Sequence, residues 1–482
     1  MSTMTTLAQV QAMLPGSSLL NISAQDAQSY KISRVGTDSR QIQSQELFIA
    51  LAGERFDAHN FLSDIAKAGA AALISNQDKC PPNLPAVCIP DTRAGLGALA
   101  RAWRSAHPIP LALVTGSNGK TTVKEMIASI FKAAVGEEHT LVTKGNLNNE
   151  IGLPLTLLKL RPSDQLAVVE LGMNHPGETA QLARIAQPNI VLINNAQREH
   201  QEFMATVAAV AQEHSDAIKA LPKEGIAVFP ADSEFVDVWH KAAAGRKIID
   251  FVLLSGESKL QAAVMGRILS NGHTQIQTKL GSIEIQLNTL GSHNVCNALA
   301  ATAVAIAAGI GLDKIKRGLE AFTPVNGRMQ AKKIDPNHTL IDDSYNANPD
   351  SVKAAIDALK QSGNKAWLVL GDMGEVGNQG PEFHREVGAY AAAQGVVRLF
   401  ALGEQCQYAI QGFDQTPKSG VPIVNAMHFS DVDSLITQLR DALQSQSAGN
   451  SKEHLNILVK GSRFMRMERV VQALLEEAKT CS

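Results

Sequence analysis

The chain has few cysteines, and their spacing excludes two classes of small fold. Its 482 residues include five cysteines, and no two of them form a Cys-x-x-Cys pair. An odd and scattered set argues against a disulfide framework and against a zinc ribbon. Such usage is typical of a reducing compartment, so we expect a cytoplasmic protein.

Long apolar runs and blocks of like charge are also missing. The most apolar stretch, residues 295–311, contains Asn297 and consists mostly of alanine and glycine, so it predicts a buried helix and no membrane span. The first residues lack a basic flank followed by an apolar stretch, so we expect no signal peptide. Lys plus Arg number 44 and Asp plus Glu number 46. This near-neutral balance argues against a DNA-coating protein and does not exclude small anionic ligands.

The length suffices for several hydrophobic cores. At roughly 150 residues per domain, 482 residues predict about three domains. A proline-rich stretch that follows Cys80 cannot continue a helix or a central strand and ends the first unit. Another α/β pattern begins near Pro324. We therefore predict an α/β protein with domains at 1–84, 85–323 and 324–482.

Short apolar strands alternate with helical patterns through the second and third units. The expected strands lie at 111–116, 166–172, 189–195, 226–230, 338–343, 367–372, 396–403 and 455–461. This alternation predicts parallel sheets covered on both faces. Residues 255–292 instead alternate polar and apolar residues around Asn271-Gly272, which predicts an antiparallel hairpin appended to the central sheet. We expect substrates to bind between the two parallel domains.

The most specific motif is a glycine-containing loop between an apolar strand and a helical pattern. The loop comprises Thr115, Gly116, Ser117, Asn118, Gly119, Lys120, Thr121 and Thr122. Glycines allow backbone N–H groups to surround a phosphate, and the following helix N-terminus favours negative charge. Lys120 is then placed to reach the β- and γ-phosphates of ATP, and the Thr121 hydroxyl to ligate Mg²⁺.

The loop is shorter than a general P-loop and does not by itself name a reaction. Val114 occupies the position where an additional glycine is usual, so only Gly116 precedes Gly119-Lys120. A ligase, a kinase and an NTP-driven switch all fit this loop. Glu170 ends another apolar strand, where its carboxylate suits Mg²⁺. Arg328, at the junction with the third unit, can reach a phosphate when the domains close.

Several longer segments in order carry a resemblance. With the shortened loop, residues 37–40, 51–59, 144–158, 168–178 and 342–351 resemble the Mur ligase family. The resemblance implies a small N-terminal α/β domain, a central parallel-sheet P-loop ATPase domain and a C-terminal Rossmann-like domain. It also implies an ATP-dependent, Mg²⁺-requiring ligase that joins D-alanyl-D-alanine to a UDP-N-acetylmuramoyl tripeptide through an acyl phosphate in peptidoglycan precursor synthesis. We expect a monomer.

The same resemblance implies roles for individual residues. Catalysis and metal binding fall to Lys120, Thr121, Glu170 and His200. Nucleotide contacts fall to the loop residues together with Asn297 at the adenine, Arg328, and Asp343 near the ribose. Substrate contacts fall to Ser39 and Arg40 at the UDP end, to Asn146 and Asn149, and to Tyr345, Asn346 and Asn348 facing the amino substrate.

Two departures from the family pattern concern the second metal. The family histidine usually follows alanine, whereas His200 follows Arg198-Glu199. The family also commonly has a carbamylated lysine downstream, where this chain has His214. Imidazole does not form a stable carbamate, so the ligand set must differ. Glu213 and Asp216 are both candidates for the missing oxygen.

Three alternatives remain open at this point. A diamino-acid-adding Mur-type ligase shares the fold, but its usual Asp-Asn-Pro-Arg run is missing here. A folate polyglutamylating ligase resembles the second and third units and needs neither 37–40 nor 51–59. An NTP-hydrolysing switch would release phosphate without requiring an amine or carboxylate substrate. No Ser-His-Asp or Cys-His signature indicates a covalent nucleophile.

Overall fold

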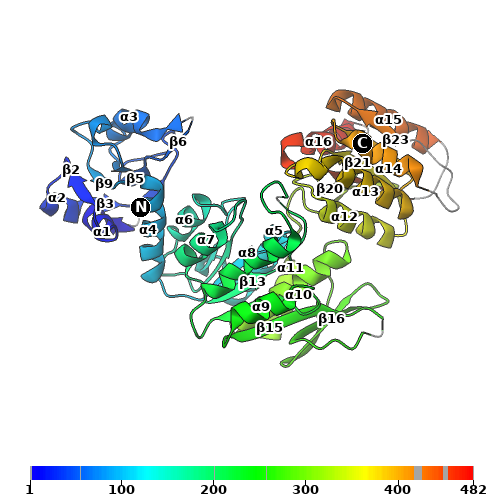
Figure 1. The fold of residues 1–482 in the computed structure, drawn as a ribbon, viewed down its shortest axis with the longest axis horizontal. Helices are drawn as coiled ribbons and strands as arrows, with labels where there is room; N and C mark the ends of the chain where they lie inside the picture. The colour runs from blue at the N-terminus through cyan, green and yellow to red at the C-terminus, as the bar shows by residue number, and fades with distance from the viewer. Residues whose placement is uncertain are drawn as a thin grey trace.

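The protein folds into three α/β units arranged one after another along the chain. The computed structural model describes residues 3–54, 56–199, 201–256, 258–416, 426–448 and 454–480. The first and third units lie on opposite sides of the central one, in the blue and the yellow-to-red parts of Figure 1. The predicted three-domain fold class is confirmed. The boundaries at 84 and 323 remain our proposal.

The first unit is built on a five-stranded sheet of order β2-β9-β8-β5-β4. Its strands are β2 (Ser18–Leu20), β4 (Arg34–Gly36), β5 (Glu46–Ile49), β8 (Ala71–Ile74) and β9 (Ala86–Cys88). All pairs are parallel except β2 with β9. The remaining elements are β1 (Thr5–Thr6), α1 (Leu7–Ala12), α2 (Ala24–Ser29), β3 (Lys31–Ile32), β6 (Ala52–Gly53), β7 (Phe56–Asp57), η1 (Ala58–Phe61), α3 (Leu62–Lys67) and η2 (Gln77–Lys79).

Helix α4 (Thr92–Ser105) connects the first unit to the second. The Asp91 side chain begins the helix by accepting from the backbone N–H groups of Arg93 and Ala94. Buried Arg104 near its end donates to the carbonyls of Ala186 and Gln187 and to Asn189 Oδ1. These contacts join α4 firmly to the central unit.

The central unit contains a nine-stranded sheet of order β11-β12-β10-β13-β14-β15-β16-β17-β18. Its strands are β10 (Leu111–Thr115), β11 (Thr140–Val142), β12 (Leu166–Glu170), β13 (Ile190–Ile193), β14 (Ile226–Pro230), β15 (Lys247–Leu253), β16 (Val264–Ile268), β17 (Thr274–Thr278) and β18 (Gly281–Ile285). The pairs from β11 to β16 are parallel, and β16, β17 and β18 pair antiparallel. The predicted appended hairpin is therefore confirmed, with its turn at Gly272 (φ 82°).

Helices cover both faces of the central sheet, which explains its continuously apolar strands. They are α5 (Lys120–Val135), η3 (Glu137–His139), α6 (Gly152–Leu157), α7 (Glu178–Ala186), α8 (Val207–Lys219), α9 (Val236–Ala243), α10 (Ser292–Ala307) and α11 (Leu312–Ala321). One core packs α4, α6, α7, α8 and α9 against the sheet, and another packs α5, α10 and α11. The alanine-rich stretch predicted as a buried helix is α10.

The third unit repeats this layered plan. Its sheet has the order β19-β20-β24-β21-β22-β23, parallel except for β19 with β20. The strands are β19 (Gln330–Lys333), β20 (His338–Asp343), β21 (Lys365–Gly371), β22 (Arg398–Leu402), β23 (Ala426–Phe429) and β24 (Leu455–Lys460). The helices are α12 (Pro349–Gln361), η4 (Gly377–Gln379), α13 (Gly380–Ala393), α14 (Cys406–Gln415), α15 (Val432–Ala448), η5 (Arg463–Met465) and α16 (Glu468–Thr480).

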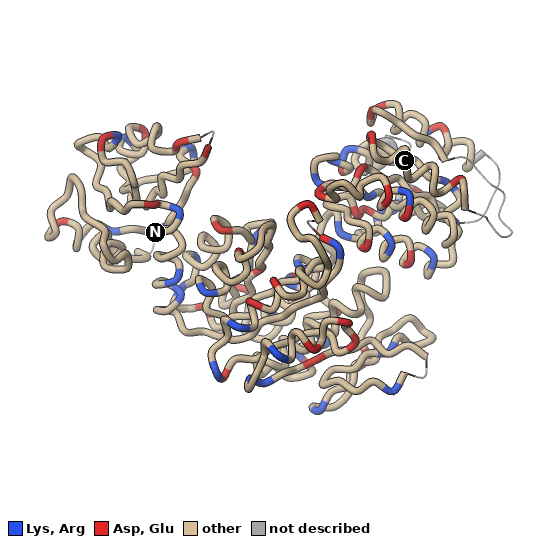
Figure 2. The backbone as a smooth tube through the Cα atoms, viewed as in Figure 1, with Lys and Arg blue, Asp and Glu red and all other residues tan. Residues whose placement is uncertain are grey.

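Charge is dispersed over all three units. Figure 2 shows lysine and arginine interspersed with aspartate and glutamate along the whole tube. Among the described residues, no helix combines the length and apolar character needed to cross a bilayer.

Candidate functional site

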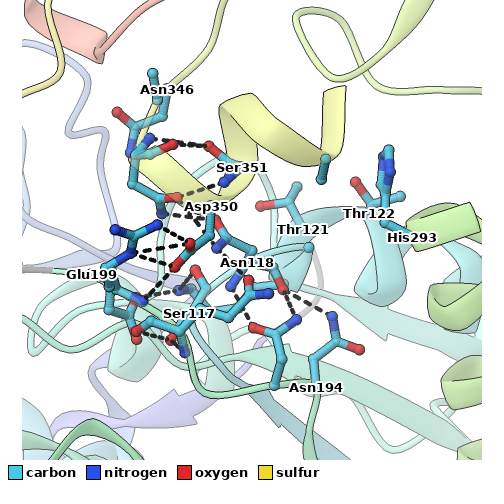
Figure 3. Close-up of a pocket in the computed structure, with 18 of the residues that line it drawn as sticks. Ser117, Asn118, Thr121, Thr122, Asn194, Glu199, His293, Asn346, Asp350 and Ser351 are labelled. Carbon is cyan, nitrogen blue, oxygen red and sulfur yellow. Dashed lines mark hydrogen bonds and ion pairs between the residues drawn. The ribbon is translucent and has the colours of Figure 1, made fainter. Parts of the chain in front are cut away.

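A large cleft lies between the central and third units. Its cavity volume is about 1260 Å³, and it is lined by the glycine loop, the ends of β12 and β13, the start of α10, and the loops that follow β20 and β24. The carboxyl ends of parallel strands therefore supply both walls, as expected for open α/β sheets. Figure 3 shows Asp350 and Ser351 of α12 beside Asn118 of the glycine loop.

The glycine loop joins the end of β10 to the start of α5. Gly116 and Gly119 have φ values of 129° and 78°, which glycine adopts at little cost. A Cβ atom at Gly119 would lie 2.6 Å from Asn297 Oδ1 and 2.7 Å from Asn194 Nδ2. Any larger residue would therefore push the loop away from α10 and β13.

A chain of asparagine amides braces this loop. Asn194 donates to the Asn118 carbonyl at 2.8 Å and to Asn297 Oδ1 at 2.8 Å. Asn297 in turn donates to Asn294 Oδ1 at 3.1 Å. Asn297, the predicted adenine contact, lines the cleft but already has partners within the protein. Buried amides need such partners, so the network holds the loop in one conformation.

Lys120 begins α5 and lies within the loop. Its ammonium donates to the Gly116 carbonyl at 2.5 Å and to the Ser117 carbonyl at 3.1 Å. It also lies 3.3 Å from Glu199 Oε2. The backbone carbonyls of the loop thus hold the positively charged Lys120 ammonium against the loop.

Glu170 and Thr121 form a buried oxygen cluster beside Lys120. The Thr121 hydroxyl donates to Glu170 Oε1 at 3.2 Å, and the Asn148 amide donates to the same atom at 2.8 Å. The other carboxylate oxygen, Oε2, is buried and has no hydrogen-bond partner within the described structure. An unpaired buried carboxylate oxygen next to a hydroxyl is a donor set that suits Mg²⁺, so these residues fit the implied metal.

The predicted second-metal candidates have different surroundings. His200 lies outside the described residues. Glu213 accepts from the N–H groups of Gly177 and Thr179 at the start of α7, and Asp216 pairs with Lys219 at 2.6 Å. Glu213 is therefore held by the start of α7, and Asp216 by a lysine of its own helix, α8.

Glu199 is the carboxylate that approaches Lys120, and the sequence analysis did not select it. It is 6% exposed, and its Oε1 lies 3.0 Å from His214 Nε2. His214 is fully buried, and its Nδ1 lies 3.1 Å from Thr115 Oγ1. The His214 imidazole thus connects Glu199 to the end of β10.

The third unit reaches the glycine loop through the start of α12. The Asn348 side chain caps α12 by accepting from the Ser351 N–H, and its amide donates to Asn118 Oδ1 at 2.9 Å. Asn118 also donates to Gln197 Oε1 at 2.7 Å. The cap of a third-unit helix therefore contacts the loop directly.

Arg198 contacts the third unit through both its backbone and its side chain. Its backbone N–H donates to Asp350 Oδ2 at 2.9 Å, and its guanidinium pairs with Asp350 and, at 2.8 Å, with Glu386. The guanidinium also lies 5.1 Å from the centre of the Phe383 ring. Burial lowers the pKa of Arg198, but hydrogen bonds to Asp350 and Glu386 outweigh burial and raise it overall. Arg198 is therefore a charged bridge across the cleft.

Two arginines flank Tyr345 on the third-unit wall. The Arg328 guanidinium lies 4.2 Å from the Tyr345 ring centre, and Arg463 lies 5.7 Å from it. Asn346 is exposed beside them and accepts from the Arg463 N–H at 3.3 Å. Asp343 is occupied by Lys460 and by the Met329 N–H. Because β20 and β24 are adjacent, Asp343 and Lys460 lie side by side.

Of the remaining predicted residues, two line the cleft and two do not. Asn146 is exposed in the cleft, and Asn149 lines it while its side chain accepts from the Gly152 N–H at the start of α6. Ser39 and Arg40 lie outside this cavity in the first unit, where Arg40 pairs with Asp38 at 2.9 Å. The hydrogen bond from Arg40 lowers the pKa of Asp38 to about 2.

Several polar cleft residues were not selected in the sequence analysis. Four of them are Asn148, Asn194, Glu199 and Asp350. Three of them directly neighbour residues that were singled out, in the asparagine run 146–149, in Arg198-Glu199-His200 and in 342–351. Asn194 ends the predicted strand 189–195, and its position after an apolar strand was the available signal.

A glycine loop that faces the loops of a second parallel domain is the arrangement of an ATP-dependent enzyme whose substrates meet between two domains. Residues 31–104 match the family profile described as "Mur ligase family, catalytic domain", residues 114–305 match "Mur ligase middle domain", and residues 327–463 match "Mur ligase, glutamate ligase domain". The chain belongs to the Mur ligase family.

Individual relatives share almost the entire chain. The UDP-N-acetylmuramoyl-tripeptide--D-alanyl-D-alanine ligase of Haemophilus influenzae is 38% identical over 454 residues, covering 94% of this chain and 95% of the relative. The Escherichia coli ligase of the same name is 39% identical over 451 residues, covering 93% and 95%. A crystal structure of MurF from Acinetobacter baumannii superimposes with a TM-score of 0.86 at 32% identity, covering 98% and 99%.

Proposed function

We propose that the chain joins D-alanyl-D-alanine to a UDP-N-acetylmuramoyl tripeptide with the use of ATP, in peptidoglycan precursor synthesis. The observation that carries this proposal is the identity with ligases of that name over more than nine-tenths of the chain. The cleft supports it, since a phosphate-binding loop on one wall faces amides and guanidinium groups on the other. The same similarity disfavours a diamino-acid-adding ligase, a folate ligase and an NTP-driven switch.

The reaction is carboxylate activation followed by amide formation. The terminal carboxylate of the tripeptide attacks the γ-phosphorus of ATP, ADP leaves, and an acyl phosphate forms. The free amine of D-alanyl-D-alanine then attacks the acyl carbon. The nitrogen loses a proton, phosphate leaves, and the amide remains. We assign to Lys120 the neutralisation of the phosphate charge, because the loop backbone already holds its ammonium beside the glycines.

The protein groups around Glu170 would hold Mg²⁺. Thr121 offers a hydroxyl and Glu170 a buried, unpaired oxygen. His200, a ligand implied by the resemblance, remains part of this proposal. When bound, Mg²⁺ supplies positive charge that stabilises the transferring phosphoryl group.

We assign the third-unit wall to the incoming dipeptide and to the closing of the cleft. Asn346 and Arg463 are exposed beside Tyr345, where an amide and a guanidinium can hold a carboxylate. Arg328 and Asp343 are kept as nucleotide contacts, and Asn348 as a substrate contact at the start of α12. Ser39 and Arg40 are kept for the UDP end. The ligase would act as a monomer in the cytoplasm, where ATP is available.

The test is phosphate release from ATP and Mg²⁺ with the UDP-muramoyl tripeptide, with and without D-alanyl-D-alanine. We expect release to require both substrates, and mass spectrometry to show the pentapeptide product. Release that is indifferent to the dipeptide would contradict the proposal and favour a switch. A response only to a diamino acid with the dipeptide precursor would identify the other Mur-type activity.

A further inference from the structure

Phe464 is a large apolar side chain that is exposed inside the cleft. It is 63% exposed and lines the cavity beside Arg463 and Gly374. The other exposed large hydrophobic side chains of the described structure, such as Leu280 at 60%, lie outside this cavity. A single exposed hydrophobic residue needs no ligand by itself, so the position of the ring must supply the reason for its exposure.

The Phe464 ring is held in place by the loops around it. Phe464 belongs to η5, directly after β24, and follows the buried residue Ser462. The Ser462 hydroxyl donates to the Ala347 carbonyl at 2.9 Å and accepts from the Gly374 N–H at 2.8 Å. A Cβ atom on Gly374 would lie 2.8 Å from Phe464 Cε1. One edge of the ring therefore rests on the backbone of Gly374, in a place that only glycine leaves open.

The residues next to the ring are polar. The Arg463 N–H donates to Asn346 Oδ1 at 3.3 Å, and both residues are exposed in the cavity. Under the proposed function, these two residues hold the carboxylate of D-alanyl-D-alanine. In that dipeptide the carboxylate and the C-terminal methyl group are bonded to the same carbon. A carboxylate held beside Arg463 therefore brings this methyl group close to the next residue in the chain, Phe464.

We propose that Phe464 is a specificity-determining residue whose ring packs against the C-terminal methyl group of the incoming dipeptide. The proposal rests on the proposed function and names the part of the substrate that this side chain selects. Amide and guanidinium groups hold a carboxylate, but they do not distinguish a methyl group from hydrogen. An apolar surface makes that distinction, because covering it with a methyl group removes apolar area from water.

Three dipeptides test the proposal in steady-state ligation assays of the full chain with ATP, Mg²⁺ and the UDP-muramoyl tripeptide. They are D-alanyl-D-alanine, D-alanyl-glycine, which lacks the C-terminal methyl group, and glycyl-D-alanine, which lacks the other. In the wild type, kcat/KM should be about tenfold lower for D-alanyl-glycine than for D-alanyl-D-alanine. Phe464→Ala should reduce this preference to about threefold or less and leave the preference over glycyl-D-alanine unchanged. Phe464→Leu should retain most of the preference, since it keeps an apolar contact.

Two further variants separate the role of the ring from a general effect on the fold. Gly374→Ala should reproduce the selective loss of Phe464→Ala, because the added Cβ atom displaces the ring. Leu280→Ala removes an equally exposed side chain outside the cavity and should keep all three rates. In Phe464→Ala, thermal unfolding and the affinity for AMP-PCP, a non-hydrolysable ATP analogue, should match the wild type.

Several outcomes would overturn the role of Phe464. One is a Phe464→Ala variant that keeps the wild-type preference for D-alanyl-D-alanine over D-alanyl-glycine. Another is an equal fall in kcat/KM for all three dipeptides, which would indicate a general structural role. A change confined to glycyl-D-alanine would assign the ring to the other methyl group. A wild type that joins none of the dipeptides to the tripeptide would instead refute the proposed function, so the two failures are distinct.

Discussion

Two buried histidines, His214 in the central unit and His384 in the third, have very different partners. His384 lies in α13, where its Nδ1 is 2.7 Å from the Gly380 carbonyl and its Nε2 accepts from the Met373 N–H at 2.9 Å. His214 instead contacts the side chains of Thr115 and Glu199. The His384 imidazole thus bonds backbone groups, whereas the His214 imidazole bonds side chains, one of which lines the cleft.

The groups around His384 look like a metal site but are already satisfied. Asp372, His384 and Cys406 have ligand atoms within 4.8 Å of one another. However, Asp372 accepts from the N–H groups of Gln405 and Cys406, and the Cys406 thiol donates to the Leu370 carbonyl. Burial raises the pKa of the Cys406 thiol well above its usual value, which keeps it protonated. The comparison teaches that two buried histidines can differ completely in their partners, backbone groups for one and side chains for the other.

The largest expected effect concerns the phosphate loop. Lys120→Ala should lower the rate of phosphate release by about three orders of magnitude, since it removes the positive charge held at the loop. Thermal unfolding should change little, because the loop remains braced by its asparagines. Stopped assays of phosphate release, with circular dichroism for the fold, provide the measurement. Activity near that of the wild type would refute the assignment of Lys120.

Arg198 tests whether the central unit and the third unit act together. Arg198→Ala should lower kcat/KM for the dipeptide by about ten- to a hundredfold, because the ion pairs with Asp350 and Glu386 that close the cleft are lost. AMP-PCP affinity should change far less. Arg385→Ala is a matched control, because Arg385 pairs with Glu382 on the same helix, lies over the Tyr408 ring and does not line the cleft. Equal losses in the two variants would contradict the bridging role.

The next prediction contrasts stability with activity. His384→Gln should lower the free energy of unfolding by about 1–3 kcal/mol, because a buried backbone group loses its partner. We expect kcat to stay within about twofold, since His384 itself does not line the cleft. Urea unfolding and steady-state assays measure the two quantities. A variant with normal stability and reduced kcat would show that His384 matters for activity rather than for stability, which would contradict the contrast with His214.

The smallest effect is a pH dependence. Burial lowers the pKa of His384 below its usual value of 6.5, so the unfolded chain binds more protons than the folded chain in this range. Stability should therefore be fully present above pH 6.5 and should fall as the pH falls below it, by at most about 1.4 kcal/mol per pH unit for one histidine. His384→Gln should show a shallower fall in urea unfolding between pH 7.5 and 5. An identical slope would exclude this histidine as the source.

The predicted strands were recovered where apolar residues run without interruption. Residues 111–116, 166–172 and 455–461 became β10, β12 and β24. β15 was not predicted, because Lys247 and Asp250 interrupt its apolar pattern. The strand β23 was also not predicted, since it is short and contains His428. Central parallel strands are buried by helices on both faces, so they appear in the sequence as continuous apolar runs that can be predicted.

The candidate site was predictable in its local part only. The loop 115–122 and Glu170 follow apolar strands, and their position at the carboxyl ends of a parallel sheet followed from that pattern. Contacts between residues far apart in the sequence could not be predicted from the pattern of apolar strands. Asn118 and Asn348 are distant in sequence, and they meet because α12 begins at the cleft.

The sequence by itself determined the α/β class, the phosphate loop and the family, because these depend on local patterns and on motifs that retain their order. Only the tertiary structure decided which carboxylate serves the loop. Glu199, Glu213 and Asp216 are chemically similar and close in sequence, yet Glu213 caps α7, Asp216 pairs with Lys219, and Glu199 meets Lys120 and His214. The direction in which each side chain leaves its element set that outcome, and this direction is fixed only when helices and sheet pack together.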